Sequence, residues 1–148
     1  MNPDNVEILL VEDNQYDAEM TIRALKKVNL ANKLVHLNDG EVAVNFIFAL
    51  KEYSDRDTTR NPKVILLDIK MPKVDGIEIL RLIKSDEHTK TIPVVIMTSS
   101  KEEQDIITSY SLGVNSYVVK PVDFEGFAKA VSELGLYWLL TNQAPLNQ

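Results

Sequence analysis

The stretch Val64–Asp68 limits the fold more than any other, because four consecutive apolar residues run directly into an aspartate. The run is short and carries β-branched side chains, and Pro72 follows shortly after it. Such a run is typical of a strand buried on both faces, as in a parallel sheet. Open α/β sheets bind ligands just beyond the carboxyl ends of their strands. We therefore expect Asp68 at a ligand site, although a single aspartate there can also serve only as a loop cap.

Three further apolar runs also end in polar residues. If these strands are parallel neighbours, one edge of the sheet gathers carboxylates, a hydroxyl group and an ammonium group. Carboxylates this close repel each other unless a cation lies among them. The runs and the residues that end them are Ile8–Val11 with Glu12 and Asp13, Pro93–Met97 with Thr98 and Ser99, and Val118–Val119 with Lys120.

Segments with helical apolar spacing separate these runs, so strand and helix alternate five times. This alternation predicts an α/β fold with a doubly wound five-stranded parallel sheet, in the flavodoxin-like order 2-1-3-4-5. The expected strands are Val6–Val11, Lys33–Leu37, Val64–Leu67, Pro93–Met97 and Ser116–Val119. The expected helix starts are Asn14, the Asp39-Gly40 turn, Gly76, Ser100 and Asp123.

Two helices and one loop carry more detailed expectations. The fourth helix should bury the stripe Ile106, Ile107 and Tyr110 and end at Gly113. The polar stretch Lys51–Asn61 has no apolar period and is expected to be a solvated loop. The inner face expected for the last helix is Phe124, Phe127, Ala128, Val131, Leu134 and Trp138.

The length of 148 residues fits one domain, 1–148, with a core of about 7–140 and a frayed tail 141–148. A net charge of −6 argues against binding nucleic acid. The chain has no cysteine, which excludes thiolate metal sites and fits a cytoplasmic location. We do not expect the polar start Met1–Asn5 to act as a signal peptide, and no apolar run is long enough for a membrane span.

The carboxylates Glu12, Asp13 and Asp68 predict a site for a hard cation. Oxygen ligands favour Mg²⁺, with Mn²⁺ as a substitute and the main-chain carbonyl of Lys70 as a further ligand. Calcium would require more protein oxygens, and no dedicated calcium loop is visible.

The same edge suits transfer of a phosphoryl group to a carboxylate. Lys120, Thr98 and Ser99 can bind phosphoryl oxygens, and Asp68 can attack in line to give an aspartyl phosphate.

Together these residues resemble the receiver domain of two-component response regulators. The resemblance covers about Glu7 to Leu140 and depends on several motifs in the right order and spacing. Its motifs are Glu12-Asp13, Asp68 with Met71-Pro72 and Gly76, Thr98, Tyr117 and Lys120-Pro121.

The resemblance implies a signalling protein and not an enzyme, phosphorylated on Asp68 by a partner histidine kinase. It also implies a cis bond before Pro121 and a switch formed by Thr98 and Tyr117. The loop Lys51–Asn61, the segment Asn115–Phe124 and the ending Leu136-Tyr137-Trp138 resemble single-domain regulators of bacterial phytochrome kinases.

Two alternative functions share parts of this pattern. A metal-dependent phosphatase with an aspartate nucleophile would place a second aspartate where Lys70 stands. A flavin-binding module would need a phosphate loop after the first strand, where Glu12 and Asp13 would repel a phosphate.

The end of the last helix is apolar almost all round its axis, and the sheet can cover only one side of it. The exposed remainder predicts a homodimer, and the usual dimer surface of receiver domains supports this expectation. The expected interface residues are Leu136, Tyr137, Trp138, Leu139 and Leu140.

Overall fold

Five parallel strands form one sheet in the order β2-β1-β3-β4-β5, as the alternation of strands and helices predicts. The computed structural model describes residues 5–121 and 123–143. The predicted strands are confirmed, although the first, second and fourth start one or two residues later than expected and the fourth also ends one residue later. Their bounds are β1 Ile8–Val11, β2 Leu34–Leu37, β3 Val64–Leu67, β4 Val94–Thr98 and β5 Ser116–Val119.

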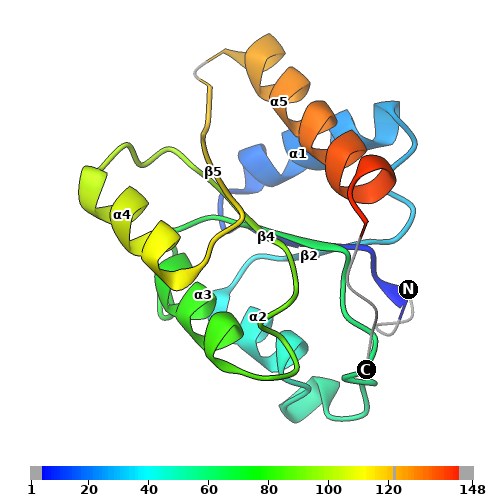
Figure 1. The fold of residues 1–148 in the computed structure, drawn as a ribbon. Helices are drawn as coiled ribbons and strands as arrows, with labels where there is room; N and C mark the ends of the chain where they lie inside the picture. The colour runs from blue at the N-terminus through cyan, green and yellow to red at the C-terminus, as the bar shows by residue number, and fades with distance from the viewer. Residues whose placement is uncertain (1–4, 122, 144–148) are drawn as a thin grey trace.

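Helices follow the strands and cover both faces of the sheet (Figure 1). The first helix begins after Asn14, whose side chain accepts a 3.0 Å hydrogen bond from the backbone N–H of Asp17, as predicted. Asp123 caps the last helix in the same way, through the N–H of Gly126. The helices are α1 Gln15–Lys27, α2 Gly40–Ile47, α3 Gly76–Ser85, α4 Glu103–Leu112 and α5 Phe124–Leu136, which continues as a π-helical turn Tyr137–Thr141.

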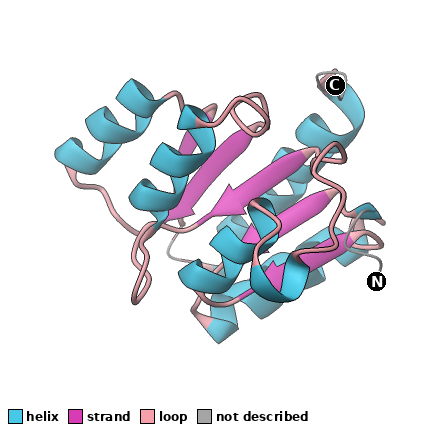
Figure 2. Cartoon of the chain, turned by 90° about the horizontal axis from the view of Figure 1, so that it is seen from below, coloured by secondary structure: helices cyan, strands magenta, loops and turns pink. Residues whose placement is uncertain are grey.

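Alternate residues of each strand face opposite sides of the sheet, and helices cover both sides, so both faces are buried. On one face Ile8 and Leu10 pack with α1 and α5, in a core that includes Leu25 and Val131. On the other face the alternate strand residues pack with α2 and α3. Figures 1 and 2 show the sheet between these layers. The central strands β1, β3 and β4 are buried at every position, which requires continuous apolar runs, whereas most residues of the edge strands β2 and β5 are half-buried.

The fourth helix differs from its prediction. It begins at Glu103 and not at Ser100, and its N-cap residue Glu102 makes no side-chain capping bond. Ile107 and Tyr110 are 50% and 54% exposed, so the expected apolar stripe is not buried. The helix packs mainly against α3, so Ile107 and Tyr110 remain in contact with solvent. Gly113 ends it with φ of 98°, as predicted, because glycine adopts this conformation without strain.

The stretch 51–61 is mostly exposed, as predicted for a solvated loop, but one buried arginine attaches it to the protein. Arg56 is 7% exposed, and its guanidinium group donates to the carbonyls of Phe46 and Ile47 at 2.7 and 2.8 Å. These carbonyls lie at the end of α2, where helix carbonyls lack partners within the helix. The arginine therefore caps α2 from the following loop.

The inner face of the last helix is confirmed for Phe127, Val131 and Trp138, which are buried, and for Ala128 and Leu134, which are partly buried. The side chain of Phe124 and tail residues 144–148 lie outside the described part, so their predictions are untested. Within the described residues, no helix combines the length and apolar character that a membrane span requires.

Candidate functional site

Three carboxylates meet at the carboxyl edge of the sheet, as predicted. Glu12 and Asp13 follow β1, and Asp68 follows its neighbour β3. One carboxylate oxygen from each residue lies within 4.8 Å of the others. Glu12 and Asp68 are 3% and 7% exposed, whereas Asp13 is exposed to solvent. The cluster is therefore a partly enclosed set of oxygen ligands that is open on the side of Asp13.

The backbone around Asp68 fixes the direction of its carboxylate. Its Oδ1 accepts a 2.8 Å hydrogen bond from the N–H of Ile69, which leaves Oδ2 facing Lys120 at 3.5 Å. The following loop closes on itself, because the N–H of Gly76 donates to the carbonyl of Ile69 at 2.8 Å. A Cβ at position 76 would lie 2.0 Å from the carbonyl oxygen of Asp68. Only glycine permits this approach, so Gly76 holds the loop against the acceptor residue.

Lys120 connects the cluster to the first helix. Its Nζ lies 2.6 Å from Glu12 Oε1 and 2.8 Å from Asp17 Oδ2, and its side chain is 8% exposed. Burial lowers the pKa of Lys120, but the hydrogen bonds to Asp17 and Glu12 outweigh it and raise the pKa to about 12. The sequence did not assign Asp17 to the site. Asp17 lies three residues after Asn14, and that spacing was interpreted only as helix capping.

Burial raises the pKa of Glu12 to about 8 and the negative charge of Asp68 adds to this, while the hydrogen bond from Lys120 opposes it. A second positive charge in the cluster would stabilise the ionised carboxylate. The donors are all carboxylate oxygens, the ligands that Mg²⁺ and Mn²⁺ prefer. The residues present therefore fit the predicted cation.

Thr98 and Tyr117 are both bonded to Ser100, in the loop after β4. The fully buried Thr98 accepts a 3.3 Å hydrogen bond at Oγ1 from the N–H of Ser100. The hydroxyl of Tyr117 donates to the carbonyl of Ser100 at 3.0 Å. The Ser100 hydroxyl donates to Asp105 of α4 at 2.7 Å. The sequence assigned Ser100 only a capping role, although it joins both expected switch residues to α4.

Other predicted residues lie around this centre. Ser99 is exposed and lines a surface hollow together with Lys120. The side chain of Lys70 is 59% exposed, and its ammonium group lies 3.6 Å from Asp105. His36 lies on the edge strand β2, and its Nε2 is 2.8 Å from the main-chain oxygen of Glu12.

The expected cis peptide bond before Pro121 is not found, since the described residues contain no cis peptide bond. The trans form is the intrinsically favoured state of an X–Pro bond. In this form Lys120 already reaches the carboxylates of Glu12 and Asp17, so the ion pairs do not require the cis form.

A parallel sheet in this order, with an acidic cluster and a buried lysine at its carboxyl edge, defines the class of phosphoacceptor signalling domains. The response regulator receiver domain model matches residues 8–132, and the chain belongs to this family. The phosphatase and flavin-binding alternatives are not favoured by this membership.

Relatives of known type cover nearly the whole chain. Response regulator Rcp1 of Synechocystis is 39% identical over 97% of this chain and 95% of its own length. The probable methanogenesis regulatory protein FilR2 of Methanothrix harundinacea is 40% identical over 93% of this chain and 86% of its own.

Two solved structures have the same fold. The Mn²⁺-bound form of Rcp1 matches with a TM-score of 0.86 and 38% identity, over 93% of this chain and 97% of that one. The phosphorylated cyanobacterial phytochrome response regulator RcpA matches with a TM-score of 0.87 and 37% identity, over 93% and 96%.

Proposed function

We propose that Asp68 accepts a phosphoryl group from a partner histidine kinase in a magnesium-dependent reaction. The observation that carries this assignment is the position of Asp68, whose Oδ2 faces Lys120 beside Glu12 and Asp13. No other described carboxylate combines the end of the central strand with these neighbours.

In the proposed reaction, an oxygen of Asp68 attacks the phosphorus of a phosphohistidine on the kinase. The new O–P bond forms as the P–N bond breaks, and the leaving imidazole nitrogen keeps the electron pair. Lys120 places a positive charge near the transferred oxygens. The side chains of Glu12, Asp13 and Asp68, with the main-chain carbonyl of Lys70, would hold Mg²⁺, which supplies further positive charge when bound.

Signalling in this proposal passes through Thr98 and Tyr117. The hydroxyl of Thr98 would leave the N–H of Ser100 to bind the phosphoryl group, with Ser99 as an additional donor. Because Tyr117 is bonded to the carbonyl of Ser100, a shift of this residue would also move the ring. Phosphorylation would thereby favour one of two arrangements of the loop and α4.

The proposed partner is a bacterial phytochrome kinase. The name of RcpA, the long loop 51–61 and the ending Leu136-Tyr137-Trp138 support this choice. The protein would then act as a carrier of the phosphoryl group in the cytoplasm, without turnover of a substrate of its own. The net charge of −6 supports signalling through proteins and not through nucleic acid or a membrane.

We also propose a homodimer through the end of the last helix, with a smaller set of contacts than the sequence predicted. Trp138 and Leu139 are each 8% exposed, because they pack into the core of their own chain. They are therefore not available as direct contacts. Leu136, Tyr137 and Leu140 are 39%, 50% and 70% exposed and remain as the proposed interface.

The intact mass of the protein after incubation with acetyl phosphate and Mg²⁺ tests the assignment of Asp68. The wild type and the control Asp55→Asn, which changes an exposed loop carboxylate, should each gain one phosphoryl group. Asp68→Asn should gain none. Equal labelling of Asp68→Asn and the wild type would overturn the assignment.

A further inference from the structure

The ammonium group of Lys120 lies near three carboxylates, but its distances to them are unequal. An ammonium group has three N–H donors. Two of them are used at 2.6 and 2.8 Å, on Glu12 and Asp17, whereas the oxygen of Asp68 lies at 3.5 Å. The lysine is therefore held toward the first helix and away from a full hydrogen bond with Asp68.

Asp17 differs from the other two partners of Lys120. Glu12 and Asp68 belong to the group of carboxylates that can hold a metal ion, and Asp17 does not. It comes from the first turn of α1, and its side chain is 22% exposed. Metal binding would engage oxygens of Glu12 and Asp68, and Asp17 would remain as the partner of Lys120 outside the metal site.

A lysine without this partner would compete with the cation. Its ammonium group would turn to the two remaining carboxylates, Glu12 and Asp68, and neutralise the charge that attracts the metal. A unit charge at hydrogen-bond distance in a partly buried setting interacts strongly with a carboxylate, because little solvent screens it. Holding the lysine on a third carboxylate therefore leaves the metal ligands more available.

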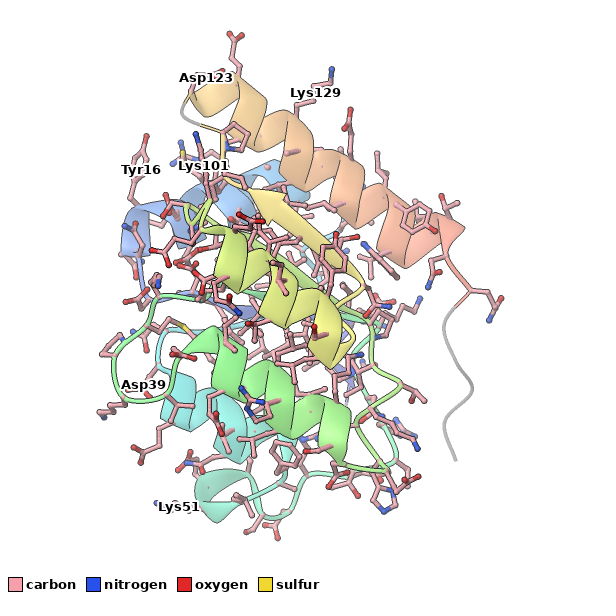
Figure 3. The ribbon with its side chains drawn as sticks, turned by 60° about the vertical axis from the view of Figure 1, so that its left-hand side comes forward. Tyr16, Asp39, Lys51, Lys101, Asp123 and Lys129 are labelled. Carbon is pink, nitrogen blue, oxygen red and sulfur yellow. The ribbon has the colours of Figure 1, made fainter. Side chains whose placement is uncertain are left out.

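We propose that Asp17 is a positioning residue that holds the Lys120 ammonium group so that Glu12 and Asp68 can bind the cation and the phosphoryl group. This inference rests on the proposed function and adds to it a fourth carboxylate with a separate role. Asp17 and Lys120 both line a surface hollow of about 250 Å³. Figure 3 labels two other residues of that hollow, Tyr16 near the start of α1 and Asp123 before α5.

A purely structural role for Asp17 must be distinguished from this one. An acidic residue in the first turn of a helix also stabilises that helix through its dipole. In addition, removal of any nearby negative charge weakens cation binding through space. Neither effect requires Lys120, so a double-mutant cycle between the two residues separates them from the proposed role.

The experiment measures Mg²⁺ affinity by calorimetric titration of wild type, Asp17→Asn, Lys120→Met and the double variant. We expect Asp17→Asn to weaken Mg²⁺ binding by about fivefold or more in the wild-type background, from the loss of a partly exposed ion pair. In the Lys120→Met background the substitution should weaken binding less, because only the through-space loss of a negative charge remains. Asp17→Glu keeps the charge and should restore binding, and Glu19→Gln, an exposed carboxylate of the same helix, should not weaken it.

Equal weakening by Asp17→Asn in both backgrounds, or none in either, would overturn the proposal. Asp17→Ala provides the same comparison if the asparagine variant does not fold. Phosphorylation of each variant with acetyl phosphate is measured in parallel. A wild type that is not labelled on Asp68 rejects the proposed function, whereas a labelled wild type without coupling between Asp17 and Lys120 rejects only the positioning role.

Discussion

The hydroxyl of Tyr117 donates a 3.0 Å hydrogen bond to the main-chain carbonyl of Ser100, and this bond ties the fifth strand to the loop that follows Thr98. Thr98 is bonded to the N–H of the same Ser100. The two expected switch residues are thus connected through one peptide segment and not by direct contact.

This shared partner predicts that Thr98→Ala and Tyr117→Phe are non-additive. Each should destabilise the unphosphorylated protein by about 0.5–1.5 kcal/mol, the usual contribution of one hydrogen bond. The double variant should lose less than the sum, because the first substitution already loosens Ser100. Urea denaturation of the four proteins measures this coupling. Strictly additive free energies of unfolding would show that the two residues act independently.

The ion pair between Lys70 and Asp105 predicts an effect on the lifetime of the phosphorylated protein. Lys70 stands two residues after the acceptor, and its ammonium group is held at 3.6 Å by Asp105 of α4. Asp105→Asn should release the lysine toward the acyl phosphate, shield it from water and slow its decay. The decay of the intact mass peak measures this. In a Lys70→Ala background Asp105→Asn should change nothing, and a slower decay there would contradict the explanation.

The raised pKa of Glu12 predicts that the metal-free protein loses stability as the pH rises. Its folded pKa of about 8 exceeds the ordinary value of 4.5, so the folded protein keeps a proton that the unfolded chain releases. The free energy of unfolding should fall between these values, by at most about 1.4 kcal/mol per pH unit. Lys120 adds no slope there, because its folded and unfolded pKa values both lie at or above 10.5. Urea denaturation at several pH values measures the slope.

Glu12→Gln should remove this slope, whereas Glu103→Gln, which changes an exposed carboxylate of α4, should leave it intact. Saturating Mg²⁺ should also reduce it, because the cation replaces the proton as the partner of the carboxylate. If the pH dependence of the free energy of unfolding persists in Glu12→Gln, other titratable groups cause it.

Substitution of Asp13, the exposed carboxylate of the cluster, should have opposite effects on metal binding and on the stability of the metal-free protein. Asp13→Asn should weaken Mg²⁺ binding by at least tenfold, because one of three charged ligands is lost. It should leave the metal-free fold unchanged or up to about 1 kcal/mol more stable, since repulsion from Glu12 and Asp68 is relieved. Calorimetric titration and urea denaturation measure the two quantities. Unchanged Mg²⁺ affinity would exclude Asp13 from the site.

The exposed end of the last helix predicts a dimer that depends on Tyr137. Sedimentation of the wild type at micromolar concentration should show a dimer, and Tyr137→Asp should shift it to monomer by placing a charge in the interface. Tyr16→Asp is the matched control, since Tyr16 is 64% exposed on α1 and lies outside the proposed interface. A wild-type monomer with and without phosphodonor would refute the proposed assembly.

The sequence predicted the sheet because the burial of strands on both faces leaves a local pattern. Val64–Leu67 and Ile8–Val11 are apolar at every position, and a strand buried on both faces requires this pattern however the core is packed. The carboxylates that follow these strands were placed together for the same reason, since parallel neighbours end at one edge. Caps such as Asn14 and Asp123 are also local, because the side chain and its N–H partner are three residues apart.

Tertiary structure decided what depends on neighbours distant in the chain. The exposure of Ile107 and Tyr110 follows from the place of α4 beside α3 near the sheet edge, which apolar spacing alone does not reveal. The burial of Arg56 depends on its hydrogen bonds to the carbonyls of Phe46 and Ile47 at the end of α2. The burial of Leu139 depends on the turn that extends α5, which brings this side chain into the hydrophobic cluster beside α1.

The site shows the same division between local and distant information. The chain by itself determined which strand ends carry carboxylates, a hydroxyl group and a lysine, because these residues adjoin the apolar runs that define the strands. It did not determine that Lys120 lies between Glu12 and Asp17, which are more than 100 positions away. The length and rotation of a lysine side chain allow several partners, and the packing of α1 against α5 beside the sheet selects among them.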